Sequence, residues 1–400
     1  MIKKSISTYN IEIILIFITG FIVGSSWAKY LLSTIGINFF IFELFLIPYL
    51  IYKRKLFFSL LKDLFHLTLI PTFLYIILFC SILFGTINNN GNFISVFTTT
   101  RPFFYIILII NYFYKTKDIN INKIYTWSIA SIIGEAIFIQ FIQINRNWYY
   151  INVVTLALII IIPLIEKKPI KYIFSMCLGL FISIISGYRI NLLIIIVGNL
   201  TALFWIIFFN FTKIKIKQLL KRIFLLVIII FFLIIIIQNY IFIIDMISKF
   251  IKIERATIYR ITDRLKYFLM GDFSSSQDTT RLNNYKMIPN EFNENLIPTG
   301  LIGKTLDYYG TYTDVPIILL FESFGSVLSI FILIVINLIG FIAFIKSFYC
   351  YNITQIVAGL MYPIFIILFV INGTFIYFTN VSLMTALIIS RWFSYYKFKS

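Results

Sequence analysis

Continuous apolar runs of about 20 residues recur along this chain, and they constrain its fold more than any other feature. One of them, LLVIIIFFLIIIIQNYIFII at 225–244, contains no charged residue. A helix of about 20 residues crosses the hydrocarbon core of a bilayer and satisfies its own backbone groups there, whereas barrel strands would alternate polar and apolar residues. The runs therefore predict an all-α, polytopic integral membrane protein.

The overall composition agrees with this class. Of the 400 residues, 60% are hydrophobic and only 12% are charged, and the mean hydropathy of +0.95 excludes a soluble globular protein. The net charge of +18 comes mainly from short basic clusters between the apolar runs. This pattern is typical of cytoplasmic loops and not of a nucleic-acid-binding surface. We therefore expect membrane lipids, and no nucleic acid, as partners.

The apolar runs predict about twelve membrane-spanning helices. The predicted spans are 11–28, 31–52, 66–87, 94–114, 124–143, 150–165, 172–188, 190–211, 223–243, 320–345, 353–372 and 374–393. The chain then divides into helices 1–9 (1–243), a large loop (244–315) and helices 10–12 (316–400). We also expect Pro316 to Phe324 to form a separate short helix before the tenth span.

Basic residues mark every second connection between the spans. These connections hold more than half of the 34 Lys and Arg residues, whereas the alternate connections are short and weakly charged. The positive-inside rule then places both termini in the cytoplasm and the large loop on the outer face. The loop is polar from Asp245 to Asp314 and contains more than half of the 16 acidic residues.

The large loop carries two helical patterns. Apolar residues at helical spacing predict an amphipathic helix at the membrane surface; they are Ile258, Ile261, Leu265, Phe268 and Leu269. Further along, Asp278 is a candidate N-cap for a helix that continues through Met287 and is ended by Pro289.

Three arginines are predicted at the outer face. Arg101 lies near the outer end of the fourth span, Arg189 lies in the tight turn between spans seven and eight, and Arg281 lies in the large loop. Guanidinium groups stay charged and bind phosphate oxygens in pairs, so these arginines are candidates for a phosphate or pyrophosphate site. The alternative is contact with phospholipid headgroups.

Four carboxylates stand out against the apolar sequence. Asp314 and Glu322 lie where the loop returns to the membrane, and each is a candidate general base on a sugar hydroxyl. Asp314 is alternatively the N-cap of a helix with Pro316 in its first turn. Glu43 and Glu135 lie within predicted spans, where they suggest proton transfer in a transporter or pairing with a neighbouring helix.

Three motifs resemble those of the O-antigen and capsular polysaccharide polymerases (Wzy-type), within the superfamily that also holds the O-antigen ligases. The SGYR turn at 186–189 resembles the SG-x-R element of that family. Arg281 followed by PTGLIG at 298–303 resembles its arginine and glycine-rich return. The segment TDVPIILLFESFG at 313–325 resembles its aspartate-containing approach to the next span.

The resemblance implies a membrane glycosyltransferase of the bacterial cytoplasmic membrane. Arg189, Arg281 and Arg101 would bind the pyrophosphate of a polyprenyl-diphosphate-linked glycan, such as an undecaprenyl diphosphate glycan. Asp314 or Glu322 would deprotonate the acceptor hydroxyl for an inverting transfer that needs no metal or other cofactor. A flippase and a chain-length regulator of the same pathway would be its partners.

Two other functions remain open on the sequence. Glu43 and Glu135 suggest a polytopic transporter or a flippase for lipid-linked oligosaccharides. An O-antigen ligase is the other alternative, although the family's ligases carry a catalytic histidine in the loop. Here the only histidine, His66, lies at the cytoplasmic end of the third predicted span.

Overall fold

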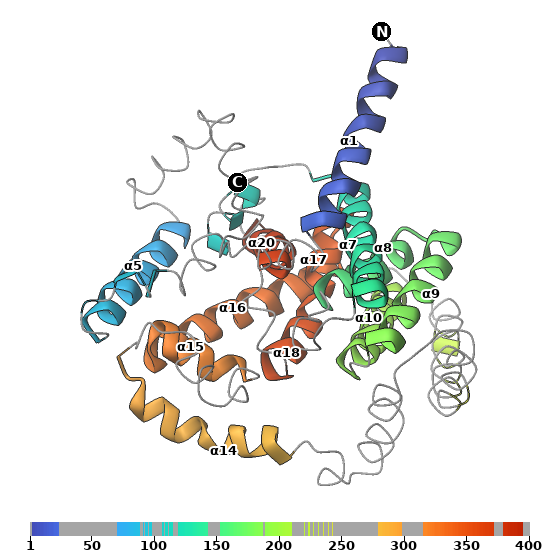
Figure 1. The fold of residues 1–400 in the computed structure, drawn as a ribbon. Coiled ribbons are helices and arrows are strands. Elements are labelled where there is room, and N and C mark those ends of the chain that lie inside the picture. The colour runs from blue at the N-terminus through green and yellow to red at the C-terminus, as the bar shows by residue number, and fades with distance from the viewer. Residues whose placement is uncertain are drawn as a thin grey trace. The chain divides into compact units, whose positions relative to one another are not determined.

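The computed structural model describes residues 2–23, 70–88, 119–142, 153–186, 189–209, 279–297, 315–371 and 379–394, together with isolated positions between them. Every regular element in these ranges is a helix, which confirms the all-α class (Figure 1). The chain divides into two compact units. The first comprises residues 1–27, 120–278 and 344–364, and the second comprises residues 28–119, 279–343 and 365–400.

The first unit is built around the helix α8 (Val153–Ile165). It contacts four helices: α7 (Ile121–Ile142), α9 (Pro169–Ser186), α10 (Arg189–Phe208) and α17 (Ile353–Leu360). The α8 sequence, VVTLALIIIIPLI, is apolar on all sides, and such a helix is stable when other elements cover it all round. All of its residues except Leu164 are buried.

The helix α1 (Ile2–Val23) packs against α7 in the same unit. A Cβ atom at Gly20 would lie only 2.6 Å from the Trp127 carbonyl oxygen. Any side chain at position 20 would collide with the α7 backbone, so glycine is what allows the two helices to approach closely here. Near the other end of the contact, Lys123 of α7 forms an ion pair with Glu12.

The second unit contains α5 (Ile70–Asn88), α14 (Thr279–Glu294), α15 (Pro316–Phe324) and α20 (Thr379–Ser394), and most of α16 (Ser326–Ser347). The helix α15 contacts both α14 and α5. The rings of Phe365, in α18 (Tyr362–Ile371), and Trp392 meet edge to face with centroids 5.0 Å apart. The Arg391 Nη2 atom donates a hydrogen bond to the Phe113 carbonyl oxygen (3.0 Å).

Two predicted helix boundaries are wrong. Pro289 does not end the loop helix, because α14 continues to Glu294. A proline removes one backbone donor, and the turn after it packs against α15 through Phe292 and Phe321. Asp314 is not the N-cap of α15. Val315 occupies that position without a side-chain cap, although Pro316 begins the helix as predicted.

The predicted spans agree with the helices where the structure describes them, but two spans are divided. The stretch 320–345 contains the end of α15 and most of α16, as expected for a separate helix at Pro316–Phe324. The span 353–372 is divided between α17 and α18. The span 31–52 and the amphipathic helix near 258–269 lie outside the described residues, and 94–114 and 223–243 are described only at scattered positions.

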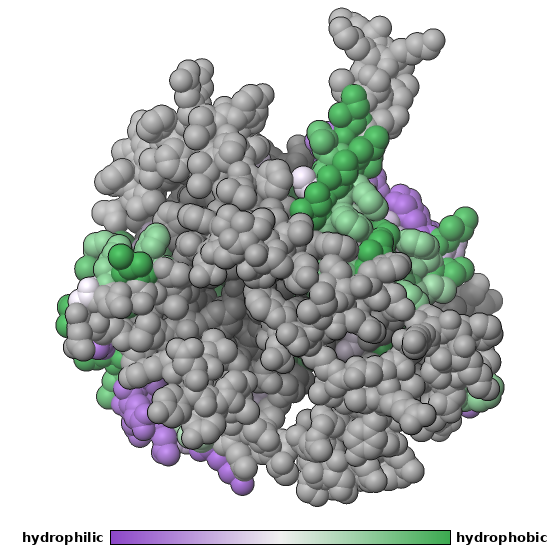
Figure 2. Space-filling view, in the orientation of Figure 1, coloured by the Kyte–Doolittle hydropathy of each residue, from purple (hydrophilic) through white to green (hydrophobic). Residues whose placement is uncertain are grey.

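Two of the described helices are long and apolar enough to cross a membrane. They are Ile190–Phe208 of α10 and Ser326–Ser347, the whole of α16. One face of α16 exposes large apolar side chains that are each 45–62% accessible; they are Val327, Phe331, Ile334, Leu338, Phe341 and Ile345. Figure 2 shows similar hydrophobic surface along α1, where Ile11, Ile14 and Leu15 are more than half exposed.

Candidate functional site

The structure describes the predicted site residues to different extents. Arg101 and Asp314 lie outside the described residues. Arg189 is the first residue of α10 and Arg281 lies in the first turn of α14, and each is described by its backbone only. Glu322 lies in α15, and its burial is described as well as its backbone.

The loop helix α14 packs against the helices that carry the chain into the predicted tenth span. The rings of Phe292 and Phe321 meet edge to face with centroids 5.8 Å apart. The Ser326 amide donates a hydrogen bond to the Asn295 carbonyl oxygen (2.7 Å). We call this region the α14–α16 corner, and its residues are Glu291, Phe292, Asn295, Phe321, Glu322, Gly325 and Ser326.

Gly325 creates the bend between α15 and α16. Its φ of 81° and ψ of 150° belong to a region that only glycine adopts readily. The Gly325 amide donates to the Phe321 carbonyl oxygen (2.8 Å). On the α16 side, the Ser329 hydroxyl lies 2.6 Å from both the Leu320 and the Gly325 carbonyl oxygens. The chain therefore changes direction directly after the segment that carries Glu322.

Glu322 is buried in this corner, with 3% of its surface exposed. A carboxylate is rarely buried so completely in a protein. The neighbouring residue Phe321 contacts α14, so Glu322 lies on the turn of α15 that meets the loop helix. The Ser326 Oγ atom is also buried and has no hydrogen-bond partner among the described residues.

A second carboxylate, Glu291, faces the corner from α14. The Asn295 Nδ2 atom donates to the Glu291 carboxylate (3.0 Å) and to the Glu291 carbonyl oxygen (2.9 Å). Burial raises the pKa of the Glu291 carboxyl above its ordinary value of 4.5, nearby Glu294 raises it further, and the Asn295 hydrogen bond lowers it. Asn295 itself is only 5% exposed.

The junction of α9 and α10, in the first unit, carries Arg189, another of the three predicted arginines. The helix α9 ends at Ser186, and α10 begins at Arg189. The Asn191 Nδ2 atom donates to the Ser186 hydroxyl (3.0 Å). The Asn191 Oδ1 atom is buried without a hydrogen-bond partner among the described residues. The first amides of a helix have no intrahelical acceptor, so the backbone at the start of α10 offers donors to an anion, whereas the Asn191 Oδ1 atom can only accept a hydrogen bond.

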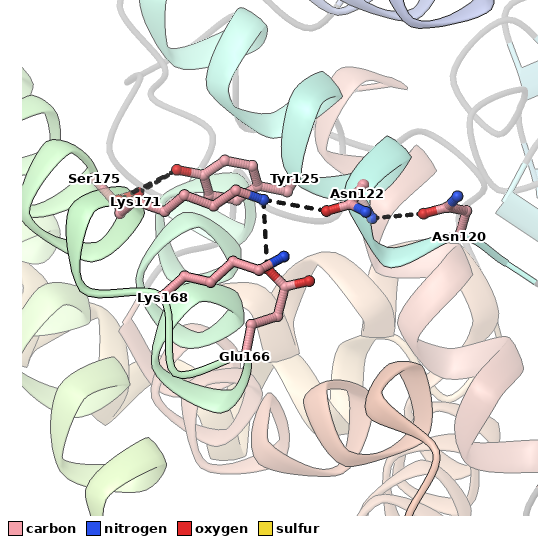
Figure 3. A network of polar contacts seen from close by, with 7 residues as sticks. All are labelled: Asn120, Asn122, Tyr125, Glu166, Lys168, Lys171 and Ser175. Atoms are coloured by element: carbon pink, nitrogen blue, oxygen red, sulfur yellow. Dashed lines mark hydrogen bonds and ion pairs between the residues drawn. The ribbon is translucent and has the colours of Figure 1, made fainter. Parts of the chain in front are cut away.

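A network of polar side chains lies at the opposite end of α9 (Figure 3). The Lys171 ammonium lies 3.5 Å from the Glu166 carboxylate and 3.2 Å from Asn122 Oδ1. It also lies 5.0 Å from the centre of the Tyr125 ring. Lys168 lies 3.2 Å from the same Glu166 carboxylate. The network joins α7 to the connection between α8 and α9.

Glu135, one of the two acids predicted within membrane spans, is buried in α7. It is 3% exposed, and its role in proton transfer or in pairing with a neighbouring helix stays a prediction. Glu43 lies outside the described residues. Within the described part of the chain, no cluster of three His, Cys, Asp or Glu side chains is arranged to bind a metal ion.

Comparison with known proteins gives no significant match to a protein-family model, a curated protein or a solved structure.

The sequence did not single out Glu291 and Asn295. Both lie in the polar loop, where acids and amides are frequent and no spacing distinguishes one from another. The one signal was that Phe292, an aromatic residue, lies between them in a polar segment. An exposed loop helix has little need of such a residue, so Phe292 indicates a helix that packs against another element.

Proposed function

We propose that the protein polymerises polyprenyl-diphosphate-linked oligosaccharide repeat units at the outer face of a bacterial cytoplasmic membrane. The observation that carries this proposal is the α14–α16 corner. There the last turns of the loop helix, whose first turn contains Arg281, pack against the helix that contains the buried Glu322. An arginine for the diphosphate and a carboxylate for the acceptor hydroxyl are the two kinds of group that such a transfer requires.

A location in the membrane is supported by α16. Its 22 residues are strongly apolar, yet only 17% of the span is buried within the protein. A core helix of a soluble protein would be covered by other elements, whereas the stripe of exposed side chains on α16 matches a helix that faces lipid. The positive-inside pattern of the sequence places the α14–α16 corner on the outer side.

The proposed reaction is an inverting glycosyl transfer. The acceptor hydroxyl oxygen attacks the anomeric carbon of the growing chain and forms the new glycosidic bond. The bond from that carbon to the diphosphate oxygen breaks, and the electron pair leaves with the polyprenyl diphosphate. The hydroxyl proton passes to the carboxylate of Glu322 or Asp314. Arg281, Arg189 and Arg101 are assigned to the diphosphate, whose negative charge increases as it departs.

Two variants test the assignment of Glu322 as the base and of Arg281 as a diphosphate ligand. Glu322→Gln keeps the size of the side chain and removes the base, and Arg281→Lys keeps the charge but removes paired binding of phosphate oxygens. We expect both variants to shorten the surface polysaccharide ladder of a deletion strain complemented in trans, at unchanged protein level. Lys286→Gln is the matched control, because Lys286 is an exposed residue of the same helix, and it should leave the ladder unchanged.

Glu322 and Asp314 are the two candidate bases. If Glu322→Gln and Asp314→Asn both give wild-type ladders, the base is another residue and the assigned chemistry is contradicted. A deletion strain that still makes full-length polysaccharide would contradict the proposed function itself.

A transporter or a flippase for lipid-linked oligosaccharides is the second candidate, and the burial of Glu135 in α7 favours it. Such a carboxylate within a predicted span is a candidate for proton coupling. Glu135→Gln separates the two functions. A polymerase should keep its ladder if the variant folds, whereas a proton-coupled transporter should lose transport while keeping its protein level.

A further inference from the structure

Lys167 adopts an unusual backbone conformation at the end of α8. Its φ of 56° makes it the one non-glycine residue with a positive φ in the described part of the chain. The Lys167 amide donates to the Leu164 carbonyl oxygen (3.1 Å), and the Lys168 amide donates to the Pro163 carbonyl oxygen (2.9 Å). This is the helix-ending motif in which glycine is strongly preferred at the left-handed position. A lysine here has a backbone cost that glycine would avoid.

The lysines near this turn carry more positive charge than their partner neutralises. The single carboxylate of Glu166 pairs with both Lys168 and Lys171, and the Glu166 side chain is only 6% exposed. Lys167 and Lys168 are exposed. The Lys171 ammonium is fixed between Glu166, Asn122 and the Tyr125 ring (Figure 3). The turn therefore presents an excess of positive charge around an ordered network.

An exposed apolar stripe begins directly after the lysines. Ile170, Ile173 and Phe174 of α9 are 83%, 60% and 52% exposed, and Cys177 is also exposed. Their spacing places them on one face of the helix. Around α9, Figure 2 shows hydrophobic surface with hydrophilic atoms beside it. A ligand that matches both features has an anionic head and an apolar chain.

We infer that the α8–α9 turn and the first turns of α9 bind an anionic phospholipid, with its phosphate at Lys167 and Lys168 and an acyl chain along Ile170, Ile173 and Phe174. A free phosphate would match the lysines only and would leave the apolar stripe exposed. The positive-inside pattern places this turn at the cytoplasmic leaflet, where anionic lipids attract basic side chains. The inference is independent of the proposed glycosyl transfer.

The conformation of Lys167 supplies a selective test. Lys167→Gly removes the charge and fits the observed φ, so the variant should fold at least as stably as the wild type. The full-length protein in nanodiscs of phosphatidylcholine would be titrated with fluorescent phosphatidylglycerol. We expect the affinity for phosphatidylglycerol to fall about fivefold for Lys167→Gly, and by a similar further factor when Lys168→Gln is added. The reason is that one basic side chain near an anionic membrane surface contributes about 1 kcal/mol of attraction.

Two further arms separate the possible ligands. Phe174→Ser should weaken the binding of phosphatidylglycerol, and inorganic phosphate at the same concentration should not displace the lipid. The matched control, Lys286→Gln on α14, should bind the lipid as the wild type does. The inference is overturned by unchanged affinity in the Lys167→Gly, Lys168→Gln double variant, by equal binding of fluorescent phosphatidylcholine, or by full displacement with inorganic phosphate.

Discussion

The helices around α8 and the α14–α16 corner are held by different kinds of contact. The helix α8 is apolar on all sides and buried against α7, α9, α10 and α17. The corner depends on an aromatic pair, one backbone hydrogen bond between Asn295 and Ser326, and the hydrogen bonds of Asn295 to Glu291. Burial on all sides fixes a helix, whereas polar contacts at the ends of helices are among the first to open. We therefore predict that the corner opens before the helices around α8 do.

The largest effect is expected in the α8 region. Ile160→Ala removes a fully buried side chain that lies against α10, and it should lower the free energy of unfolding by about 2–5 kcal/mol, through lost burial and a residual cavity. A titration with a denaturing detergent measures the change. The control is Ile334→Ala on α16, where the side chain is 53% exposed. Equal losses in the two variants would contradict the description of α8 as the packed centre.

The bend of the corner should be the next most sensitive feature. Gly325→Ala forces a Cβ atom onto a backbone with a φ of 81°, and it should cost about 1–3 kcal/mol of stability. Gly198→Ala is the matched control. A Cβ at this helical glycine makes only ordinary contacts, the nearest at 3.7 Å, so the change should be neutral or stabilising. The same denaturation titration measures both, and a neutral Gly325→Ala would show that the bend is not required.

The polar contacts of Asn295 provide a smaller and more local test. Asn295→Ala removes the hydrogen bonds to Glu291 and should cost about 1 kcal/mol. Hydrogen exchange at the Ser326 amide, which donates to the Asn295 carbonyl oxygen, should become faster, while the amides of α8 remain protected. Asn290→Ala, an exposed position on α14, is the control. Faster exchange in both regions would show that the corner does not open independently.

The smallest expected effect is the pH dependence due to Glu291. Because its folded-state pKa is raised by burial above 4.5, the folded state binds more protons, and stability is lost as pH rises from 4.5 through the folded-state pKa. Glu291→Gln keeps an acceptor for Asn295 and removes the titration. The melting temperature of the variant should therefore fall less than that of the wild type over this range. Parallel pH profiles would show that Glu291 does not titrate in the folded corner.

Much of the fold could be predicted because apolar runs determine which segments become helices. The run at 190–211 becomes α10, and Pro316 begins α15 because its fixed φ and missing amide suit the first helical position. Pro289 was misjudged, since its local effect is outweighed by packing of the following turns on α15. The count of twelve spans and the two-sided topology remain predictions.

The candidate site was less predictable from the sequence. Glu322 could be selected because a carboxylate is rare in an apolar segment. Glu291 and Asn295 could not be selected, since they lie among many polar residues and gain their environment from α15 and α16. The positive φ of Lys167 could not be predicted either, because lysine has no preference for the left-handed backbone conformation.

The most direct test of the central claim uses purified protein in vesicles, with native lipid-linked repeat units extracted from a deletion strain. We expect the wild type to extend the glycan by whole repeat units and to release one polyprenyl diphosphate for each unit added. Glu322→Gln should be strongly impaired, and the Lys286→Gln control should extend normally. Absence of extension by the wild-type protein, with movement of the intact lipid-linked unit across the vesicle membrane in its place, would contradict the claim.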